Sequence, residues 1–553
     1  MKLHTFGLPA SAALIAAQQC TPNYIRRTLP NDTSLVSVRK IAQNGTFPVS
    51  TSDIAYPMSP TQLNELCAVQ LSVSAPGNTS SGNSSYDFGL FLPIQWNDRF
   101  LAFGNDGFNG GINWLDMASG ASYGFASLST DTGHSSLLMD GSWAYQHPER
   151  LVNWGYRAMH GSVVRGKAIT QLYYNSSIAY NYYSGCSTGG RQGLKEVQEF
   201  PEDFDGVVVG APAWQTKHLQ PWTLLQGKIN LPLNSSTHIP SAKFDIVAAE
   251  VLRQCDPQDG VTDNIISDPR GCIFDPAPLG CAADTVNTTD CLTSEQLQTL
   301  NQLYTDYRYP NGSLIFPHLE LGSEAQWSIT LGVPDGVPSG LGIDYAQDFL
   351  QLGPTYNYTD YNFGLIQLAD RLDPGNATAD NFDLRPFQQR GGKLLHYHGL
   401  ADGLISEGTS PYFYHHVEQA MGAHDISLGG FYRFFEVPGM QHCSQSPAPV
   451  NAPWYFGGAT QASDLNGTFY GVPGFRDREH DIVLALMAWV EHGTAPERIV
   501  ATKWVDDDPD MGVLAQRGLC PYPGRAVYDG QGNITQASSW GCEDGDARAG
   551  LWQ

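Results

Sequence analysis

A serine in a glycine-flanked turn is the feature of this 553-residue sequence best suited to do chemistry. Residues 185–189 read Gly-Cys-Ser-Thr-Gly, a G-x-S-x-G pentapeptide centred on Ser187. A β-prone run at 178–183 precedes it, and apolar residues at helical spacing follow it as far as residue 200. A strand, a sharp turn and a helix in this order expose a serine hydroxyl. The pattern therefore predicts that Ser187 is a nucleophile.

A second G-x-S-x-G pentapeptide occurs at 120–124, with Ser122 at its centre. The residues before it, 115–119, have no strand pattern, whereas 125–130 alternate as a strand does. Ser122 thus lies in the wrong order of elements for an exposed nucleophile. We expect Ser187, and not Ser122, to react.

A serine hydroxyl needs an imidazole to accept its proton and a carboxylate to orient that imidazole. In α/β-hydrolases the acid follows the serine in the chain, and the histidine follows the acid. A predicted strand at 393–399 runs into Asp402, and another at 431–437 runs into a loop with His442. Both positions suit the carboxyl edge of a parallel sheet, where catalytic loops gather. Spacing alone leaves their roles open.

Other histidines compete for the role of base, since the chain has fifteen. His396 and His398 alternate on a predicted strand and could be core residues or could support the site. His415 and His416 lie in a helical pattern that places them at the surface. His442 differs from these because it lies in a loop after a strand and is followed by a cysteine.

A glycine-rich loop, Gly-Asn-Asp-Gly-Phe-Asn-Gly-Gly at 104–111, follows an earlier predicted strand. A loop in this place can donate a backbone N–H to an oxyanion. An ordinary turn has the same composition, and the spacing does not distinguish the two.

Composition limits the partners of the chain. The net charge of −25 comes from scarce Lys and Arg, and it disfavours nucleic acid and anionic membranes as partners. Residues 1–17 have the pattern of a signal peptide, with Lys2 before an apolar stretch and small residues at the end. Ten cysteines and glycosylation sequons spread from Asn31 to Asn533 also favour a secreted, extracellular glycoprotein. No later stretch is long and apolar enough for a membrane span.

The alternation of elements predicts the organisation of the chain. Helix and strand patterns alternate at 148–213, which indicates an α/β sheet. The pattern stops near residue 214 and returns near 392. We therefore expect a catalytic α/β domain made of 18–213 and 389–553, with 214–388 inserted as a lid. The segment 18–85 is polar and turn-rich, with one candidate helix at 60–66.

The chain resembles the fungal tannase and feruloyl esterase family, which are secreted α/β-hydrolases with a large lid. Three motifs carry the resemblance in order: Gly-Cys-Ser-Thr-Gly-Gly-Arg at 185–191, Gly-Lys-Leu-Leu at 392–395 with Asp402, and Gly439 with His442-Cys443. The resemblance extends from about residue 85 to the C-terminus. It implies an α/β-hydrolase fold with a large inserted lid domain.

The resemblance also assigns roles to residues. It implies that Ser187 is the nucleophile, Asp402 the acid and His442 the base. The Thr188 N–H would be one oxyanion donor, and the glycine-rich loop would supply the second, for which we choose Gly107.

The family's Cys-Ser, Asp, His-Cys arrangement implies that Cys186 and Cys443 pair. For the other cysteines local pairing is the simplest assignment: Cys20 with Cys67, Cys255 with Cys272, Cys281 with Cys291, and Cys520 with Cys542. Connectivity does not follow from sequence alone. A metal site built on cysteine is disfavoured because no C-x-x-C occurs and the expected compartment is oxidising.

The resemblance further implies a structural Ca²⁺ site in the lid and no organic cofactor. The ligands would be the carboxylates of Asp256, Asp259 and Asp263 and the backbone oxygens of Val261 and Ile265. The sequence supports this independently, because crowded oxygen donors suit a hard cation and Gly260 allows a sharp bend. The alternative is a solvated acidic loop.

These features predict a secreted serine carboxylesterase that acts on phenolic acid esters, free or attached to plant polysaccharide. The motif at 185–192 looks closer to feruloyl esterases than to tannases, and the chain lacks the Lys-Arg maturation site of some tannases. A feruloyl esterase that releases hydroxycinnamic acids is therefore our first expectation, and a tannase acting on galloyl esters is the alternative. Two other classes stay open: a non-catalytic carbohydrate- or protein-binding glycoprotein, and a secreted serine carboxypeptidase.

Overall fold

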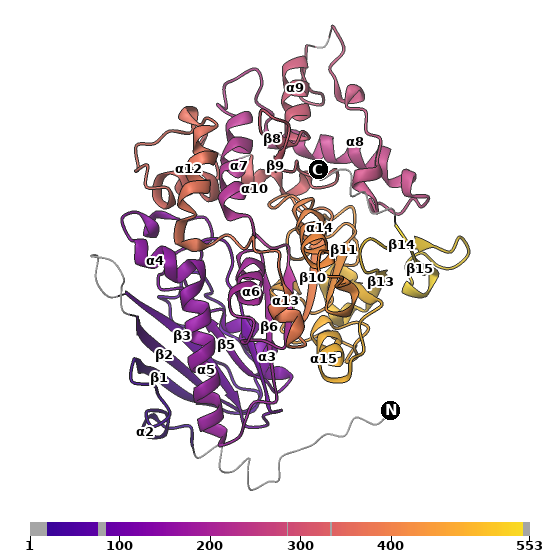
Figure 1. The fold of residues 1–553 in the computed structure, drawn as a ribbon. Coiled ribbons are helices and arrows are strands. Elements are labelled where there is room, and N and C mark those ends of the chain that lie inside the picture. Colours follow the sequence, from indigo (N-terminus) through magenta and orange to yellow (C-terminus); the bar gives the residue numbers. More distant parts are fainter. Residues whose placement is uncertain (1–18, 76–83, 285, 332–334, 546–553) are drawn as a thin grey trace.

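The structure is a computed structural model that describes residues 19–75, 84–284, 286–331 and 335–545 (Figure 1). The expected signal peptide at 1–17 lies outside the described residues. In the described chain, a central sheet lies below a mainly helical region that is inserted between two of its strands (Figure 1).

The central sheet determines where the site can be. Its strand order is β1-β2-β3-β5-β4-β6-β7-β10-β11 within the described residues. The bounds are β1 (Thr33–Ile41), β2 (Leu66–Ala75), β3 (Ser84–Pro93), β4 (Arg99–Phe103), β5 (Ala126–Thr130), β6 (Tyr180–Cys186), β7 (Gly206–Gly210), β10 (Lys393–Gly399) and β11 (Tyr432–Val437). The pairs from β1 to β5 are antiparallel, and those from β5 onward are parallel. This order confirms the predicted α/β-hydrolase fold.

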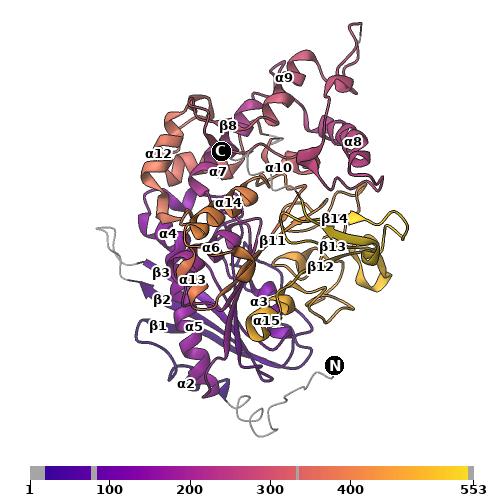
Figure 2. The same cartoon turned by 45° about the vertical axis from the view of Figure 1, so that its right-hand side comes forward.

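Helices cover both faces of the sheet (Figure 2). On one face, α5 (Ala158–Tyr174), α6 (Thr188–Glu199), α13 (Arg385–Gln389) and α14 (Thr409–Gly422) share a hydrophobic cluster with the strands. On the other face, α3 (Trp114–Ser122) and α15 (Ile482–His492) share a second cluster. Val207 and Val209 of β7 belong to the first cluster and Val208 to the second. This two-sided burial explains why β7 is continuously apolar.

The N-terminal segment differs from the sequence prediction. Residues 33–75 supply two strands of the main sheet, and the candidate helix at 60–66 is wrong. Gln62 has φ 54°, a left-handed conformation that a helix cannot include. The alternation of Leu71 and Val73 with half-buried polar residues was the strand signal.

The region between β7 and β10 is mainly helical. It contains α7 (Thr216–Ile229), α8 (Phe244–Cys255), α9 (Ser294–Leu303), α12 (Gly364–Leu372) and the hairpin of β8 (Tyr307–Arg308) and β9 (Leu314–Phe316). Trp222, Phe244, Leu300 and Trp327 are buried in a cluster made almost entirely by this region. We call residues 214–388 the lid; these boundaries stay a prediction.

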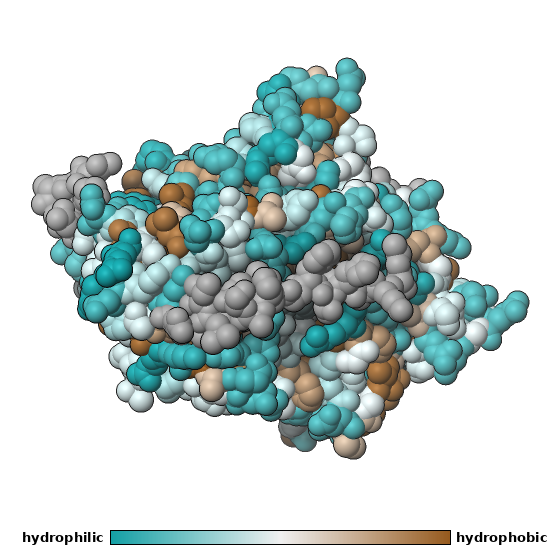
Figure 3. Space-filling view, turned by 90° about the horizontal axis from the view of Figure 1, so that it is seen from below, coloured by the Kyte–Doolittle hydropathy of each residue, from teal (hydrophilic) through white to brown (hydrophobic). Residues whose placement is uncertain are grey.

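The last described residues form two further hairpins outside the central sheet. They are β12 (Ile499–Trp504) with β13 (Val513–Leu519), and β14 (Arg525–Tyr528) with β15 (Trp540–Glu543). The face seen from below is mainly hydrophilic, with small separate hydrophobic areas (Figure 3). Within the described residues, none of the helices has the length and apolar character to span a bilayer.

Disulfide bonds join all ten cysteines. The pairs are Cys20–Cys67, Cys186–Cys443, Cys255–Cys272, Cys281–Cys291 and Cys520–Cys542. The local pairs are those of the simplest assignment, and the long-range pair is the one that the resemblance implied.

Candidate active site

Ser187 lies in the turn between β6 and α6, as the sequence predicted. Its backbone has φ 60° and ψ −124°, a conformation that costs free energy in a residue with a side chain. The turn is held because the Ser187 N–H donates to the Gly210 carbonyl (3.0 Å) and the Ala213 N–H donates to the Ser187 carbonyl (3.0 Å). This is the geometry of a nucleophile elbow.

Close packing explains the glycines of the elbow. A Cβ atom on Gly185 would lie 2.6 Å from the Gly189 carbonyl oxygen, and one on Gly190 would lie 2.5 Å from the Gly210 carbonyl oxygen. Both distances are below van der Waals contact, so only glycine fits. Ser122, by contrast, ends helix α3 and donates its hydroxyl to the Ser119 carbonyl (2.7 Å).

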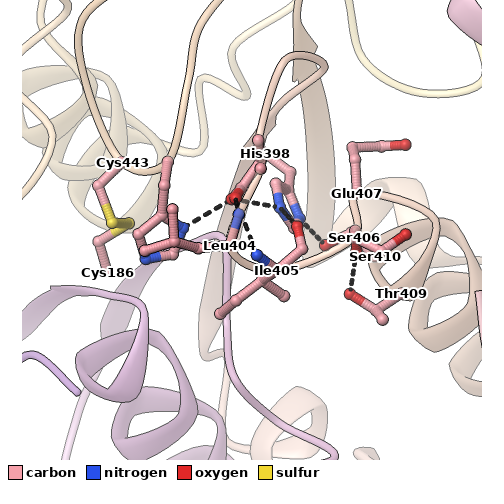
Figure 4. A network of polar contacts seen from close by, with 12 residues as sticks. Cys186, His398, Leu404, Ile405, Ser406, Glu407, Thr409, Ser410 and Cys443 are labelled. Carbon is pink, nitrogen blue, oxygen red and sulfur yellow. Dashed lines mark hydrogen bonds and ion pairs between the residues drawn. A yellow bond between two sulfur atoms is a disulfide. The ribbon is translucent and has the colours of Figure 1, made fainter. Parts of the chain in front are cut away.

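Asp402 and His442 meet after neighbouring strands of the sheet, β10 and β11. The His442 Nδ1 lies 2.6 Å from Asp402 Oδ2. The other oxygen, Oδ1, accepts the N–H groups of Leu404 (2.8 Å) and Ile405 (2.9 Å) (Figure 4). The carboxylate is fully buried, so these donors replace water around its charge.

The pKa values of the pair are coupled. Burial alone would raise the pKa of Asp402, but the charges and hydrogen bonds of His442 and His398 hold it well below its usual range. Burial alone would lower the pKa of His442, but the charge and hydrogen bond of Asp402, together with the charge of Asp106, raise it. With Nδ1–H directed at Asp402, Nε2 is the nitrogen of His442 that can accept a proton.

The Cys186–Cys443 bond joins the two halves of the site. Its Cα atoms are 5.9 Å apart, and the two cysteines are the neighbours of Ser187 and His442 in the chain. Figure 4 shows this bond beside the polar network that includes His398, Leu404 and Ile405. The elbow and the histidine loop are therefore adjacent.

The Gly107 and Thr188 amides are the expected oxyanion donors. Within the described residues, neither the Gly107 N–H nor the Thr188 N–H donates to a protein acceptor. The two positions are joined, because the Thr188 hydroxyl donates to the Gly107 carbonyl oxygen (2.8 Å). The Asp106 N–H, in contrast, donates to the Tyr56 hydroxyl (2.9 Å).

A buried polar chain supports Asp402. The Tyr432 hydroxyl contacts His396 Nδ1 (2.8 Å), and the Ser410 hydroxyl lies between His396 Nε2 (2.9 Å) and His398 Nδ1 (2.7 Å). His398 Nε2 then reaches Asp402 Oδ2 (2.9 Å). Both histidines are core residues, and His398 also supports the site. His415 is buried as well, although its sequence pattern suggested the surface.

Gln326 of the lid is a site residue that the sequence did not reveal. Its Oε1 accepts the N–H groups of Gly403 (3.0 Å) and His442 (3.1 Å). It therefore bridges the loops that carry Asp402 and His442. Its surroundings in the sequence, Ser-Glu-Ala-Gln-Trp at 323–327, contain no motif that would single it out.

The acidic loop at 256–268 lies between the bonded cysteines of the lid. Each expected aspartate ligand accepts a backbone N–H of the same loop: Asp256 from Asp263 (3.1 Å), Asp259 from Val261 (3.0 Å) and Asp263 from Ile265 (3.1 Å). Arg517 contacts the other oxygen of Asp263. Burial raises the pKa of Asp259, as does the charge of Asp263. Crowded oxygen donors of this kind fit a hard divalent cation.

A different group could also hold a metal ion. Of the described residues, only His160, Glu196 and Asp203 bring three acidic or imidazole ligand atoms within 4.8 Å of one another. The aspartates of the acidic loop do not converge to this degree. The Lys167 ammonium lies 3.0 Å from Asp203 Oδ1 and already compensates part of the charge there.

The fold and this arrangement are those of an α/β-hydrolase with a serine elbow and an Asp–His pair. The chain belongs to the tannase and feruloyl esterase family, which it matches over residues 71–338 and 344–543.

Several known proteins are similar over most of the chain. A probable feruloyl esterase B-1 of Neosartorya fischeri is 36% identical over 486 residues, which cover 86% of each chain. A probable feruloyl esterase B-2 of Aspergillus flavus is 36% identical over 462 residues, covering 83% of this chain and 84% of the relative. The crystal structure of feruloyl esterase B from Aspergillus oryzae has a TM-score of 0.85 at 32% identity, covering 96% of this chain and all (100%) of that one. Tannin acyl hydrolase from Aspergillus niger, with a TM-score of 0.72 at 21% identity and 97% coverage of both chains, shares the fold.

Proposed function

We propose that this protein is a carboxylic ester hydrolase of the feruloyl esterase type, with Ser187, Asp402 and His442 as its catalytic triad. The observation that carries the proposal is the elbow at Ser187 joined by the Cys186–Cys443 bond to the loop whose histidine contacts Asp402. The substrates would be phenolic acid esters, free or attached to plant polysaccharide. The similarity to feruloyl esterases B supports a hydroxycinnamoyl acyl group over a galloyl group.

The geometry suits acyl transfer in two steps. His442 Nε2 takes the proton as the Ser187 Oγ attacks the ester carbonyl, and Asp402 stabilises the imidazolium. The Oγ–C bond forms, the bond to the alcohol oxygen breaks, and His442 gives its proton to that oxygen. Water then attacks the acyl-enzyme in the same way and releases the carboxylic acid.

The free amides of Gly107 and Thr188 would stabilise the charge that develops on the carbonyl oxygen. Removing one such donor in a serine hydrolase typically costs 10²–10³ in kcat, roughly 3–4 kcal/mol. The hydrogen bond between Thr188 and Gly107 keeps the two amides together.

Labelling and a substrate panel test this proposal. A serine-directed phosphonate should label the wild-type protein once and should not label Ser187→Ala. Methyl ferulate, caffeate, p-coumarate and sinapate should be hydrolysed faster than methyl gallate. Labelling that persists in Ser187→Ala contradicts the triad, and a preference for methyl gallate favours the tannase alternative. Turnover of peptides instead of esters would indicate a carboxypeptidase.

We also propose that the acidic loop binds a structural Ca²⁺ through Asp256, Asp259 and Asp263 and the backbone oxygens of Val261 and Ile265. The ion would neutralise the crowded carboxylates and take no part in ester hydrolysis. The five disulfides support secretion into an oxidising compartment, where Ca²⁺ is available.

Calcium removal should lower stability. Treatment with a chelator should lower the Tm, and added Ca²⁺ should restore it, because an ion that binds only the folded state stabilises that state. Asp259→Asn should have a lower Tm that Ca²⁺ does not restore. An unchanged Tm in the chelator, with metal analysis showing no bound ion, contradicts the site.

A further inference from the structure

The glycine-rich loop after β4 is anchored to the nucleophile elbow and to the sheet. The Asn105 N–H donates to Gln192 Oε1 of α6 (3.0 Å), and the Asn105 side chain donates to the Thr130 carbonyl at the end of β5 (2.7 Å). Trp154 Nε1 donates to the Gly107 carbonyl (3.3 Å), which also accepts the Thr188 hydroxyl. These contacts fix the loop on both sides of Asp106.

Asp106 is hydrogen-bonded to Tyr56, which lies 50 positions earlier in the sequence. The Tyr56 hydroxyl accepts the Asp106 N–H (2.9 Å) and lies 3.1 Å from Asp106 Oδ2, to which it can donate its proton. One hydroxyl thus fixes both the backbone and the side chain of the residue before Gly107. Burial and the nearby Asp106 charge raise the pKa of Tyr56 well above its usual value, so the hydroxyl keeps its proton.

Asp53 links the segment that contains Tyr56 to the end of the glycine-rich loop through two hydrogen bonds. Its Oδ1 accepts the Tyr56 N–H (3.2 Å), and its Oδ2 accepts the Ile112 N–H (3.3 Å). The N-terminal segment therefore contacts the glycine-rich loop at Asp106 and also contacts Ile112, the residue directly after the loop. The family match begins at residue 71, so Asp53 and Tyr56 lie outside it.

We propose that Tyr56 is a positioning residue of the active site, whose hydroxyl holds Asp106 so that the Gly107 amide is directed at the oxyanion. This inference rests on the proposed ester hydrolase function. Without the hydroxyl, the Asp106 amide would lose its acceptor and compete with Gly107 for the oxyanion or for water. The loop would then sample orientations in which Gly107 does not donate.

A second consequence distinguishes positioning from simple stabilisation. Burial raises the pKa of Asp106, and the hydrogen bond from Tyr56 opposes this rise, so that the pKa is about 6 with all its neighbours in place. Asp464 also raises it and His442 lowers it. Loss of the Tyr56 hydroxyl should leave Asp106 neutral over a wider pH range. His442 would then lose part of the charge that raises its pKa, and its deprotonation would occur at lower pH.

The test compares Tyr56→Phe with Tyr123→Phe. Tyr123 is a matched control because its hydroxyl also bonds a buried carboxylate, Asp481 Oδ2 at 2.5 Å, and within the described residues none of its hydrogen bonds is with the triad or the glycine-rich loop. For each protein we would measure the rate of Ser187 labelling by a phosphonate, kcat and KM for methyl ferulate, and the Tm. The labelling rate is independent of the acyl group that the enzyme prefers.

We expect Tyr56→Phe to lower the labelling rate and kcat by about tenfold, less than loss of an oxyanion donor, with KM within about twofold of wild type. The acid limb of the labelling rate should move to lower pH. Tyr123→Phe should lower the Tm and leave both the labelling rate and kcat unchanged. Asp106→Asn, which keeps a side-chain acceptor for the Tyr56 hydroxyl, should move the acid limb in the same direction and should lose less of the rate at pH 8 than Tyr56→Phe does.

Other outcomes overturn the inference. Tyr56→Phe with wild-type labelling and an unmoved acid limb shows that Tyr56 does not position the loop. Equal decreases of the labelling rate and kcat in Tyr56→Phe and Tyr123→Phe show that both substitutions act through the stability of the fold, and not through the loop. Normal labelling with no turnover of ferulate contradicts the proposed substrate and leaves the Tyr56 comparison valid. Wild-type protein that is not labelled at all contradicts both.

Discussion

At the scale of single residues, Asp402 is the most constrained group of the site. Its carboxylate accepts two backbone amides and contacts two imidazoles while it is fully buried. Hydrogen bonds to the charged form favour that form, so Asp402 stays ionised over the working pH range. A fixed negative charge at this point favours the Nδ1–H tautomer of His442 and leaves Nε2 able to accept a proton, which in the proposed mechanism comes from Ser187.

The pH profile tests this arrangement. Protonated His442 cannot accept the serine proton, so kcat/KM should fall as pH falls through its pKa. Because Asp402 and Asp106 raise that pKa, the fall should begin above the ordinary value of about 6.5. Asp402→Asn should lower kcat by about 10⁴ because the tautomer is lost. Rates measured from pH 4 to 8 that stay constant contradict His442 as the base.

Sequence motifs could reveal only part of the site. The positions of Ser187, Asp402 and His442 could be predicted because each follows a strand end in the order that α/β-hydrolases use, and their catalytic roles stay a proposal. Gln326 contacts His442, which lies 116 positions away in the sequence, and Tyr56 contacts Asp106, which lies 50 positions away. No local sequence pattern encodes such contacts. Which lid residue reaches the catalytic loops depends on how the lid packs.

At the scale of elements, the same limit applies to the sheet. The parallel strands β6, β7, β10 and β11 were predictable because they are apolar and alternate with helices. The antiparallel strand β1 was missed because only its ends are buried, so its apolar alternation is weak. Its place in the sheet depends on pairing with β2.

The bond between the β6 elbow and the loop after β11 gives a prediction at this scale. We expect the double variant Cys186→Ala/Cys443→Ala to remain folded at 25 °C and to lose about tenfold in kcat, because small displacements of catalytic groups are costly. Circular dichroism and kinetics with methyl ferulate would measure this. The double variant Cys520→Ala/Cys542→Ala is the control and should lose Tm without losing kcat. If Cys186→Ala/Cys443→Ala keeps full kcat, the bond serves stability alone.

At the scale of the whole molecule, the lid contacts the strands and loops of the central sheet close to Asp402 and His442. Arg270 of the lid contacts two glutamates of the sheet region. Glu407 lies in the segment after β10, and Glu436 lies on β11. Gln326 adds a second attachment at the Asp402 and His442 loops. The lid thus supports the loops of Asp402 and His442, and we expect changes within it to reach the proposed chemistry through these contacts.

Gln326→Leu tests that support. The substitution leaves the part-buried Gly403 and His442 amides without this acceptor, which costs at most about 1–3 kcal/mol for each in the free energy of unfolding. We expect a lower Tm together with a loss of about tenfold in kcat, since the His442 loop gains freedom. Gln296→Leu is the matched control, because the partners of Gln296 among the described residues all lie within the lid, including Lys243 (2.9 Å) and the His238 carbonyl (2.7 Å). It should lower the Tm and leave kcat unchanged. Equal kcat values in the two variants would show that lid stability, and not the Gln326 bridge, supports the triad.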